Sequence, residues 1–544
     1  MIWLMAAAER RGDGLCFPEG RSLPPCKKMD DGRMGMKWLH RVTMGAAALM
    51  VASGVGAQVA VNVSVDKTKA GPKIERAVYG QFAEHLGRGI YEGIWVGPDS
   101  SIPNINGYRK DVVDALRRIK VPVIRWPGGC FADDYDWRDG IGPAAQRPER
   151  MNKFWGGVPE SNAFGTHEFM NFSELIGADA YVAANMGSAT PRDTAQWMEY
   201  MTAGGTSTLA RERRANGQDK PWTVKYIGVG NESWGCGGEM RAEFAADLSR
   251  QFGSYARLHA PGTFRVASGG SADDFNWTDV MMERAGKIFD GIGLHYYTIP
   301  GDWAKKGQAT GFTEREWAVT LRNAMALDGM IAKHEAIMDK HDPKKRVALV
   351  VDEWGTWYDQ EPGSTPGFLY QQNTIRDAEV AALTLNIFHR HTERVKMANI
   401  AQMVNVLQAM ILTDKGRMTL TPTYHLFDLY LPFQGATPFP ATVSGPHYEL
   451  GNVDLPMVDA SAAKDANGKM WLALVNLDPN KSARVTTNLT GKGQGRVLKG
   501  AAMDSHNSFD KPETVKPIAY SGRMVNGKLV FDLPAKAVAV VAID

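Results

Sequence analysis

The chain has 544 residues, of which 44% are hydrophobic and 22% are charged, proportions typical of a soluble globular enzyme. A formal net charge of +2 gives no basis for a nucleic-acid partner. With only four cysteines, the fold cannot depend on a framework of disulfide bonds, and the length allows one large and one smaller domain.

The N-terminal residues have the pattern of a targeting segment. Residues 36–57 combine a basic start, an apolar run of small residues and a cleavage motif at Val55-Gly56-Ala57. This pattern predicts a signal peptide, because the apolar run is too short and wrongly flanked for a membrane span. We therefore expect an exported bacterial protein, periplasmic or extracellular, without membrane association after cleavage. Residues 1–35 are interpreted as a non-native extension, the alternative being a disordered tail before an anchor helix.

Two cysteines, Cys130 and Cys236, would remain after such cleavage, and both lie beside motifs that carry candidate site residues. The sequence leaves two interpretations open. An export compartment would permit the two to pair, and two buried free thiols are the other possibility.

From residue 76 onward, strand patterns alternate with helix patterns for about 350 residues. The strands are expected at 77–84, 121–125, 180–184, 224–229, 264–268, 291–297 and 346–351, with an eighth ending near Gln408. The helices are expected at 108–120, 168–176, 194–202, 241–259, 277–289, 314–341 and 375–391. Eight such alternations predict a (β/α)8 barrel over residues 76–430.

Beyond residue 430 the helical periodicity disappears. Short strand patterns separated by Asp-Pro-Asn, Gly-Lys-Gly and Asn-Gly turns predict an all-β sandwich over residues 431–544. Residues 58–75 begin with a strictly alternating strand, which we expect to join this sandwich and so bring both ends of the chain into one module.

Two glutamates follow apolar strands and point to the chemistry. Glu232 follows the strand at 224–229, and Glu353 follows the strand at 346–351. The carboxyl ends of barrel strands are where α/β barrels place their catalytic groups, and paired carboxylates carry glycoside hydrolysis. Either glutamate alone could be a solvated loop residue or a charge at a helix N-terminus. The aromatic residues beside them favour a sugar site instead: Trp234, Trp354, Trp357 and Tyr358.

Other predicted strand ends carry groups that can hydrogen-bond the hydroxyls of a small sugar. They are Glu84, His85, Arg125, Asn185, Asn231, His295, Tyr297 and Gln408. His295 could also be a metal ligand, but no second histidine lies at ligand spacing. We therefore predict neither a metal nor a cofactor.

Six motifs together resemble a known family. They are GQFAEHLGRGIYEGIW (80–95), RWPGGCFADDYDWRDGIGP (125–143), GVGNESWGCGG (228–238), DGIGLHYYT (290–298), DEWGTWY (352–358) and NVLQAMILTD (405–414). In this order they resemble the α-L-arabinofuranosidases of glycoside hydrolase family 51, from about residue 59 to the C-terminus. The resemblance implies a (β/α)8 barrel with a β-sandwich, and retaining exo-hydrolysis of terminal α-L-arabinofuranosyl groups.

The resemblance also implies a role for individual residues. Glu232 matches the general acid/base of the family, and Glu353 matches its nucleophile. Residues that match positions around the arabinose or the nucleophile are Glu84, Arg125, Asn231, Tyr297 and Gln408, while Trp357 matches an aromatic in the wall of the site. Cys130 stands where some members have asparagine, and Asn185 and Trp155 are placed less firmly.

Two other functions compete with this one. A retaining endo-β-1,4-glucanase or xylanase could use the same barrel and the same two glutamates. A catalytically silent carbohydrate-binding protein would be expected to have lost one glutamate, and both are present. The expected partner is an arabinofuranosyl-containing oligosaccharide or polysaccharide, and the resemblance makes a homo-oligomer possible.

Overall fold

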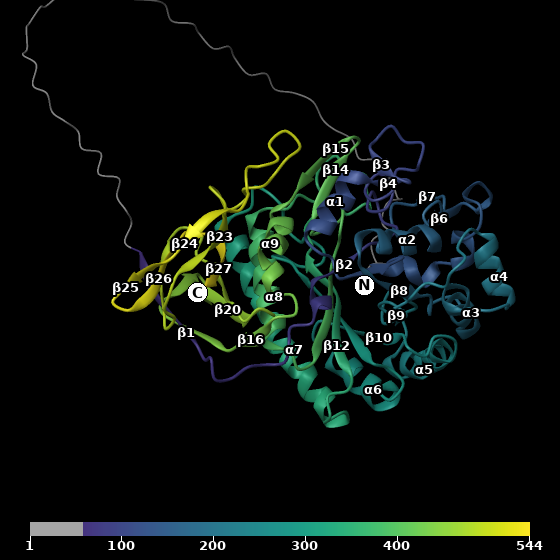
Figure 1. Cartoon of the computed structure of the whole chain (residues 1–544), viewed down its shortest axis with the longest axis horizontal. Helices are drawn as coiled ribbons and strands as arrows, with labels where there is room; N and C mark the ends of the chain where they lie inside the picture. Colours follow the sequence, from purple (N-terminus) through teal and green to yellow (C-terminus); the bar gives the residue numbers. More distant parts are fainter. Residues whose placement is uncertain (1–57) are drawn as a thin grey trace, which may run out of the picture. The chain divides into compact units, whose positions relative to one another are not determined.

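The computed structural model describes residues 58–544 (Figure 1). The predicted extension at 1–35 and the predicted signal peptide at 36–57 lie outside the described residues. Across residues 58–544, none of the helices has the length and apolar character that crossing a membrane requires.

Eight parallel strands close into a barrel, as the sequence predicted. Neighbouring strands around the barrel follow the chain order, and the last pairs with the first. They are β2 (Gly80–Phe82), β5 (Val123–Trp126), β8 (Asp179–Ala184), β9 (Tyr226–Val229), β10 (Phe264–Ser271), β11 (Gly291–Thr298), β12 (Ala348–Thr356) and β13 (Val395–Ile400).

Helices surround this barrel and connect its strands. They are α1 (Lys110–Arg118), α2 (Thr166–Ile176), α3 (Pro191–Thr202), α4 (Thr208–Ala215), α5 (Ala242–His259), α6 (Phe275–Ala285), α7 (Glu314–His341), α8 (Ile375–Arg390) and α9 (Pro422–Tyr430). Helix α7 begins at a capping box, because the Thr313 hydroxyl accepts from Glu316 N and the Glu316 carboxylate accepts from Thr313 N. That local signal explains why the predicted limits of this helix agree with the structure.

The predicted eighth strand is too long. β13 ends at Ile400 rather than near Gln408, because the chain leaves the barrel in a series of tight turns. Asn405 and Leu407 both have positive φ angles, 61° and 50°, which a strand does not tolerate. The sequence around them, MVNVL (403–407), is apolar enough to imitate a buried strand.

The chain's last hundred residues, together with its first described strand, build two sheets. The five-stranded sheet follows the order β17 (Ala441–Ser444), β1 (Val59–Val65), β22 (Ala483–Thr487), β26 (Lys528–Leu533) and β25 (Arg523–Val525). The six-stranded sheet follows the order β16 (Thr437–Phe439), β20 (Val458–Lys464), β21 (Met470–Asn476), β27 (Ala537–Ile543), β23 (Gly493–Lys499) and β24 (Ile518–Ser521). Their facing apolar side chains form a separate core.

Four antiparallel hairpins complete the strands. They are β3 (Asn104–Ile105) with β4 (Tyr108–Arg109), β6 (Arg150–Asn152) with β7 (Val158–Glu160), β14 (Ile411–Asp414) with β15 (Arg417–Leu420), and β18 (His447–Leu450) with β19 (Val453–Pro456).

Helix α8 joins the barrel to the sandwich. It contacts β12 on one side and β20, β21 and β27 on the other, and Figure 1 shows it between the two groups of strands. Every residue from Ile375 to His389 is therefore buried, including polar ones. Asn386 donates to Asp459 of β20, and His389 lies 2.8 Å from the Ser461 hydroxyl. The barrel thus shares one core with the face of the six-stranded sheet that packs on α8, while the core between the two sheets is separate.

Candidate active site

Glu353 lies near the carboxyl end of β12 and is held from two sides. Arg125 Nη1, at the end of β5, donates to Glu353 Oε1 at 2.7 Å. The Tyr297 hydroxyl, at the end of β11, donates to Glu353 Oε2 at 2.9 Å. Burial raises the pKa of Tyr297 well above its ordinary value, and the Glu353 carboxylate raises it further, so the hydroxyl keeps its proton. The two donors hold the Glu353 carboxyl group in a fixed orientation.

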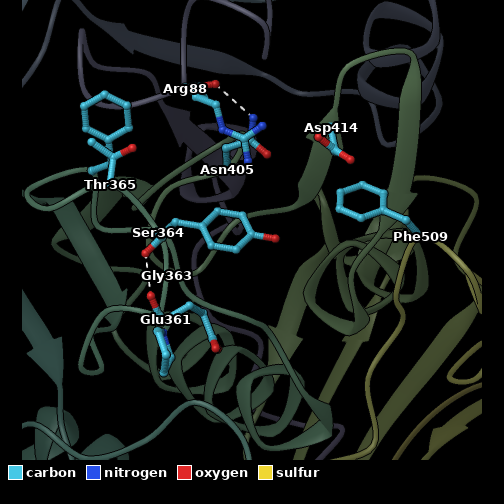
Figure 2. A pocket seen from close by; sticks show the side chains of 11 residues that line it. Arg88, Glu361, Gly363, Ser364, Thr365, Asn405, Asp414 and Phe509 are labelled. Carbon is cyan, nitrogen blue, oxygen red and sulfur yellow. Dashed lines mark hydrogen bonds between the residues drawn. The ribbon is translucent and has the colours of Figure 1, made fainter.

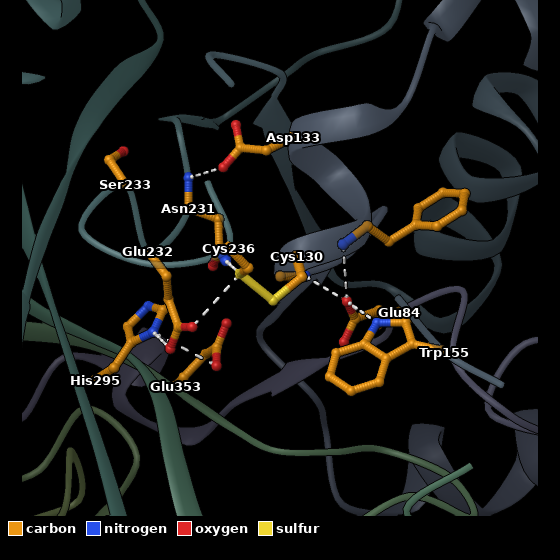
Figure 3. Close-up of a disulfide and its surroundings, with 12 residues drawn as sticks. Glu84, Cys130, Asp133, Trp155, Asn231, Glu232, Ser233, Cys236, His295 and Glu353 are labelled. Atoms are coloured by element: carbon orange, nitrogen blue, oxygen red, sulfur yellow. Dashed lines mark hydrogen bonds and ion pairs between the residues drawn. A yellow bond between two sulfur atoms is a disulfide. The ribbon is translucent and has the colours of Figure 1, made fainter. Parts of the chain in front are cut away.

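Glu232 occupies the loop that follows β9. Its φ of 35° is uncommon for a residue with a side chain, and such strained positions cluster at functional sites. Its side chain is 20% exposed and meets His295, whose Nδ1 lies 2.9 Å from Glu232 Oε1. His295 Nδ1 also lies 3.5 Å from Glu353 Oε2, and Figure 3 shows the carboxyl groups of Glu232 and Glu353 on the same side of this imidazole.

The two glutamates approach each other closely. Ligand atoms of Glu232, His295 and Glu353 all lie within 4.8 Å of one another. Burial raises the pKa of Glu232 above its ordinary value, the hydrogen bond from His295 opposes this rise, and the Glu353 carboxylate adds to it. The site therefore contains one carboxyl group held by two hydrogen-bond donors, that of Glu353, and a second, that of Glu232, whose pKa is raised.

His295 is itself surrounded by acids. Its Nε2 lies 3.4 Å from Asp352 Oδ1, on the opposite side of the ring from Glu232. Burial alone would lower the pKa of this imidazole, but the carboxylates of Glu353, Asp352 and Glu232 outweigh burial and raise it to about 10. His295 is thus a fixed positive charge at neutral pH.

Glu84 lies at the end of β2 and accepts four hydrogen bonds. The donors are Gly129 N, Phe131 N, Trp155 Nε1 and Gln402 Nε2, at 2.9 to 3.2 Å. Burial raises the pKa of Glu84 to about 7 and the Glu353 carboxylate contributes to the rise, against the effect of the donors.

The glycines of the Pro127-Gly128-Gly129 turn let the chain pass between these acids. A Cβ on Gly128 would lie 2.7 Å from Glu84 Cγ, and a Cβ on Gly129 would lie 2.8 Å from Glu353 Oε1. Side chains here would displace one acid or the other. The turn after β5 therefore shapes the site in addition to positioning Arg125.

Asn231 fixes the orientation of the Glu232 loop. Its Oδ1 accepts from Arg125 Nη2 at 2.6 Å, and its backbone N–H donates to Asp133 Oδ2 at 2.8 Å. Asp133 also accepts from two further backbone N–H groups, those of Met186 and Gly187. Asp133 is not among the site residues predicted from the sequence, and only its place within the 125–143 motif could have indicated it.

Asp352 is the other acid that the sequence analysis left without a role. Strict alternation along β12 would send Asp352 and Glu353 to opposite faces, yet Arg125 contacts both, at 3.7 Å and 2.7 Å. The pairing of β12 with β13 shifts register between Val351 and Trp354, and this irregularity brings both carboxylates inward. The irregularity is invisible in the sequence.

Gln408 does not join the cluster. Its Oε1 accepts from Thr356 N and its Nε2 donates to Asp377 O, so it supports β12 from behind. The glutamine that reaches the acids is Gln402, which donates to Glu84. Gln402 Oε1 is buried and has no hydrogen-bond partner among the described residues. Gln408 lies outside the cluster because the eighth strand ends earlier than predicted.

Aromatic side chains bound the site near Tyr297. The Trp357 ring meets Tyr297 edge to face at 5.0 Å and Trp303 at 5.5 Å between centroids. Trp303 is 58% exposed and was not identified from the sequence. Asn185, by contrast, accepts from Ser188 N and donates to Tyr135 O, and so stabilises its own loop.

Cys130 and Cys236 form a disulfide bond, with their Cα atoms 5.5 Å apart. The alternative of two free thiols is therefore wrong. The bond joins the turn that follows β5 to the Glu232 loop (Figure 3).

A separate cavity of about 420 Å³ lies beside the loop between β12 and α8. Figure 2 shows Arg88, Glu361, Asp414 and Phe509 around it, and none of the predicted site residues lines it. The Arg88 guanidinium lies over the Tyr370 ring at 5.6 Å from its centroid, so this aromatic face is already occupied.

Known proteins are similar to this chain over most of its length. Residues 115–309 match the family model described as the α-L-arabinofuranosidase 1 domain, and residues 352–537 match that of the α-L-arabinofuranosidase C-terminal domain. A Bacteroides ovatus protein named intracellular exo-α-L-arabinofuranosidase is 47% identical over 505 residues, which cover 92% of this chain and 98% of that protein.

Two solved structures are also similar to this chain. The GH51 arabinofuranosidase from Xanthomonas axonopodis pv. citri is 52% identical, with a TM-score of 0.88, over 90% of this chain and all of that chain. The α-L-arabinofuranosidase from Thermotoga maritima, solved as an arabinose complex, is 29% identical, with a TM-score of 0.77, over 89% of this chain and all of that chain.

These relatives correct the predicted location. Export to the periplasm or the medium was expected from residues 36–57, which lie outside the described part of the chain. The Bacteroides ovatus protein, similar over nearly the whole length, is named intracellular, and this finding contradicts the prediction.

The paired acids, the barrel fold and the similarity to these relatives thus indicate one family of enzymes. The chain belongs to the α-L-arabinofuranosidases of glycoside hydrolase family 51.

Proposed function

We propose that this enzyme is a retaining, exo-acting α-L-arabinofuranosidase that releases terminal α-L-arabinofuranosyl groups from plant oligosaccharides and polysaccharides. The observation that carries the proposal is the approach of Glu232 and Glu353 to within 4.8 Å at the carboxyl ends of their strands. Retaining enzymes hold their two carboxyl groups about 5–5.5 Å apart, whereas inverting enzymes leave about 6.5–9.5 Å for a water molecule. The name of the Bacteroides ovatus relative supports the exo-acting assignment over the endo-acting alternative.

In the first step, Glu353 is the nucleophile and Glu232 is the acid. A Glu353 carboxylate oxygen attacks the anomeric carbon while Glu232 protonates the glycosidic oxygen, so the bond to the leaving alcohol breaks. In the second step, Glu232 takes a proton from water, and this water displaces Glu353 from the glycosyl-enzyme. Two inversions return the α configuration.

The groups around the two acids bind the sugar. Glu84 offers carboxylate oxygens, and the buried Gln402 Oε1, which has no partner within residues 58–544, offers an acceptor for a sugar hydroxyl. Asn231 lies between Arg125 and the Glu232 loop, where it can hold the 2-hydroxyl as positive charge develops at the anomeric carbon. Tyr297 and Trp357 supply the aromatic wall.

The stereochemistry of the released sugar tests the mechanism. With an aryl α-L-arabinofuranoside as substrate, proton NMR recorded within the first turnovers should show α-L-arabinofuranose before mutarotation. Initial release of the β anomer would contradict the retaining assignment, and release of a different sugar from a panel of aryl glycosides would contradict the substrate.

The pH dependence of activity should report on His295. In His295→Gln, Glu232 loses the hydrogen bond that lowers its pKa, so Glu232 stays protonated to higher pH. The alkaline limb of the kcat/KM profile should therefore move to higher pH, whatever the loss in rate. His341→Gln, which removes an exposed histidine paired with Asp279, should leave the limb in place. A limb that moves to lower pH in His295→Gln would contradict the assignment of Glu232 as the acid.

A further inference from the structure

The disulfide bond lies at the edge of the catalytic cluster and within reach of solvent. Cys130 begins the 3-10 helix Cys130–Asp134 after β5, and Cys236 lies four positions after Glu232. Both cysteines and Glu232 are half-buried. A small thiol reductant can therefore reach the sulfur atoms without unfolding of the barrel.

The atoms around this bond have the spacing of a metal site. Cys236 Sγ lies 3.6 Å from Glu232 Oε2, and ligand atoms of Cys130, Glu232 and Cys236 lie within 4.8 Å of one another. Zinc binds thiolate sulfur at about 2.3 Å and carboxylate oxygen at about 2.0–2.2 Å, so tetrahedral angles place such ligands about 3.6 Å apart. Glu232 and Cys236 already have this separation, and the two sulfur atoms need only move from bonded contact to about 3.8 Å.

We propose that reduction of the disulfide converts Cys130, Cys236 and Glu232 into a zinc site at the edge of the catalytic cluster. A thiol reductant attacks one sulfur, and a second thiol resolves the mixed disulfide. The reductant leaves as its own disulfide and the protein gains two thiols. Zinc then displaces one proton from each thiol and binds two sulfurs and one carboxylate oxygen, with water as the fourth ligand.

The two carboxylate oxygens of Glu232 face different neighbours. Oε1 faces His295 at 2.9 Å, whereas Oε2 faces Cys236. Zinc can therefore bind Oε2 without displacing the imidazole. A zinc ion held there withdraws the carboxyl group from proton transfer, so the reduced enzyme should be inhibited by zinc. This consequence rests on the proposed role of Glu232, but the binding itself does not.

A second cluster that also contains Glu232 is less suited to zinc. Glu232, His295 and Glu353 also lie within 4.8 Å of one another. Both ring nitrogens of His295 face carboxylate oxygens, at 2.9 Å and 3.4 Å, so neither presents a free lone pair to a metal. Such a site would also bind zinc whether or not the disulfide is intact, and this difference separates the two clusters.

The test compares oxidised enzyme with enzyme treated with dithiothreitol and desalted under argon. Equilibrium dialysis against ZnCl₂ should show one zinc per reduced chain, bound at least about 100-fold more tightly than by oxidised enzyme. Titration with CoCl₂ should give sulfur-to-cobalt charge-transfer absorption in the reduced sample only. Near-UV circular dichroism checks that the reduced enzyme stays folded. Equal zinc binding by the two forms would overturn the proposal.

Variants assign the ligands. Cys236→Ser and Cys130→Ser should each lose the tight zinc binding and the cobalt band after the same treatment, with turnover compared with and without zinc within each variant. Retention of the cobalt band in the double variant would exclude these sulfurs as ligands. Zinc uptake by the reduced enzyme without loss of turnover would support the metal site and contradict the proposed role of Glu232, so the two failures are distinguishable.

Discussion

Replacement of Glu353 by alanine should reduce hydrolysis of every arabinofuranoside by about 10⁴- to 10⁶-fold, as removal of a covalent nucleophile does in other hydrolases. The reason is that no glycosyl-enzyme can form when the carboxylate fixed by Arg125 and Tyr297 is missing. The measurement is kcat with 4-nitrophenyl α-L-arabinofuranoside, on protein whose thermal unfolding and circular dichroism are checked against the wild type.

Azide should give this variant a diagnostic product. The anion can occupy the space left by the Glu353 carboxylate and attack the substrate directly, so the product should be β-L-arabinofuranosyl azide, with inverted configuration. Glu243→Ala removes an exposed carboxylate in the first turn of α5 and should leave turnover unchanged. Activity close to wild type in Glu353→Ala would rule out the nucleophile assignment.

The second large effect should come from Glu232→Ala. An arabino-oligosaccharide needs its leaving oxygen protonated, so its hydrolysis should fall by about 10²- to 10⁴-fold. A nitrophenyl leaving group scarcely needs a proton, so glycosylation should survive while deglycosylation becomes slow. The glycosyl-enzyme should then accumulate, and steady-state kinetics should show that both kcat and KM decrease.

Azide separates this variant from the first. It needs no general base, so it should restore turnover of the nitrophenyl substrate and give α-L-arabinofuranosyl azide, with retained configuration. Glu243→Ala again provides the control, since azide should not change its products. The reversed pattern, with the α azide from Glu353→Ala and the β azide from Glu232→Ala, would exchange the two roles.

The barrel and its two acids could be predicted because their signals are local. Buried parallel strands give continuous apolar runs, and the acids stand where those runs stop, as at Val229 and Val351. The limits of α7 could be predicted because Thr313 and Glu316, which form its capping box, can be recognised in the sequence. The family resemblance then assigned roles to Glu232 and Glu353 that spacing alone could not.

The remainder of the site depends on contacts between distant segments. His295 contacts Glu232, which lies 63 positions away in the sequence, through one ring nitrogen and Asp352 through the other. The residues next to His295 in the sequence indicate neither partner. The structure places Gln402 beside the acids in place of the predicted Gln408, and this difference has a similar cause. Turns at positive φ place the two residues on different sides of β12. The disulfide joins positions 106 apart, and the sequence could not choose between pairing and free thiols.

The position of β1 in the five-stranded sheet has a consequence for biosynthesis. This strand lies between β17 and β22, and Val65 bonds Asn488 across 423 positions. At a synthesis rate of about 5–20 residues per second, that separation corresponds to roughly 20–85 s during which β1 has left the ribosome before its partners exist. Throughout that interval both of its edges can pair with strands of other nascent chains. The barrel can form while the chain is still being made, whereas the sandwich closes only after its last strand, β27, has been synthesised.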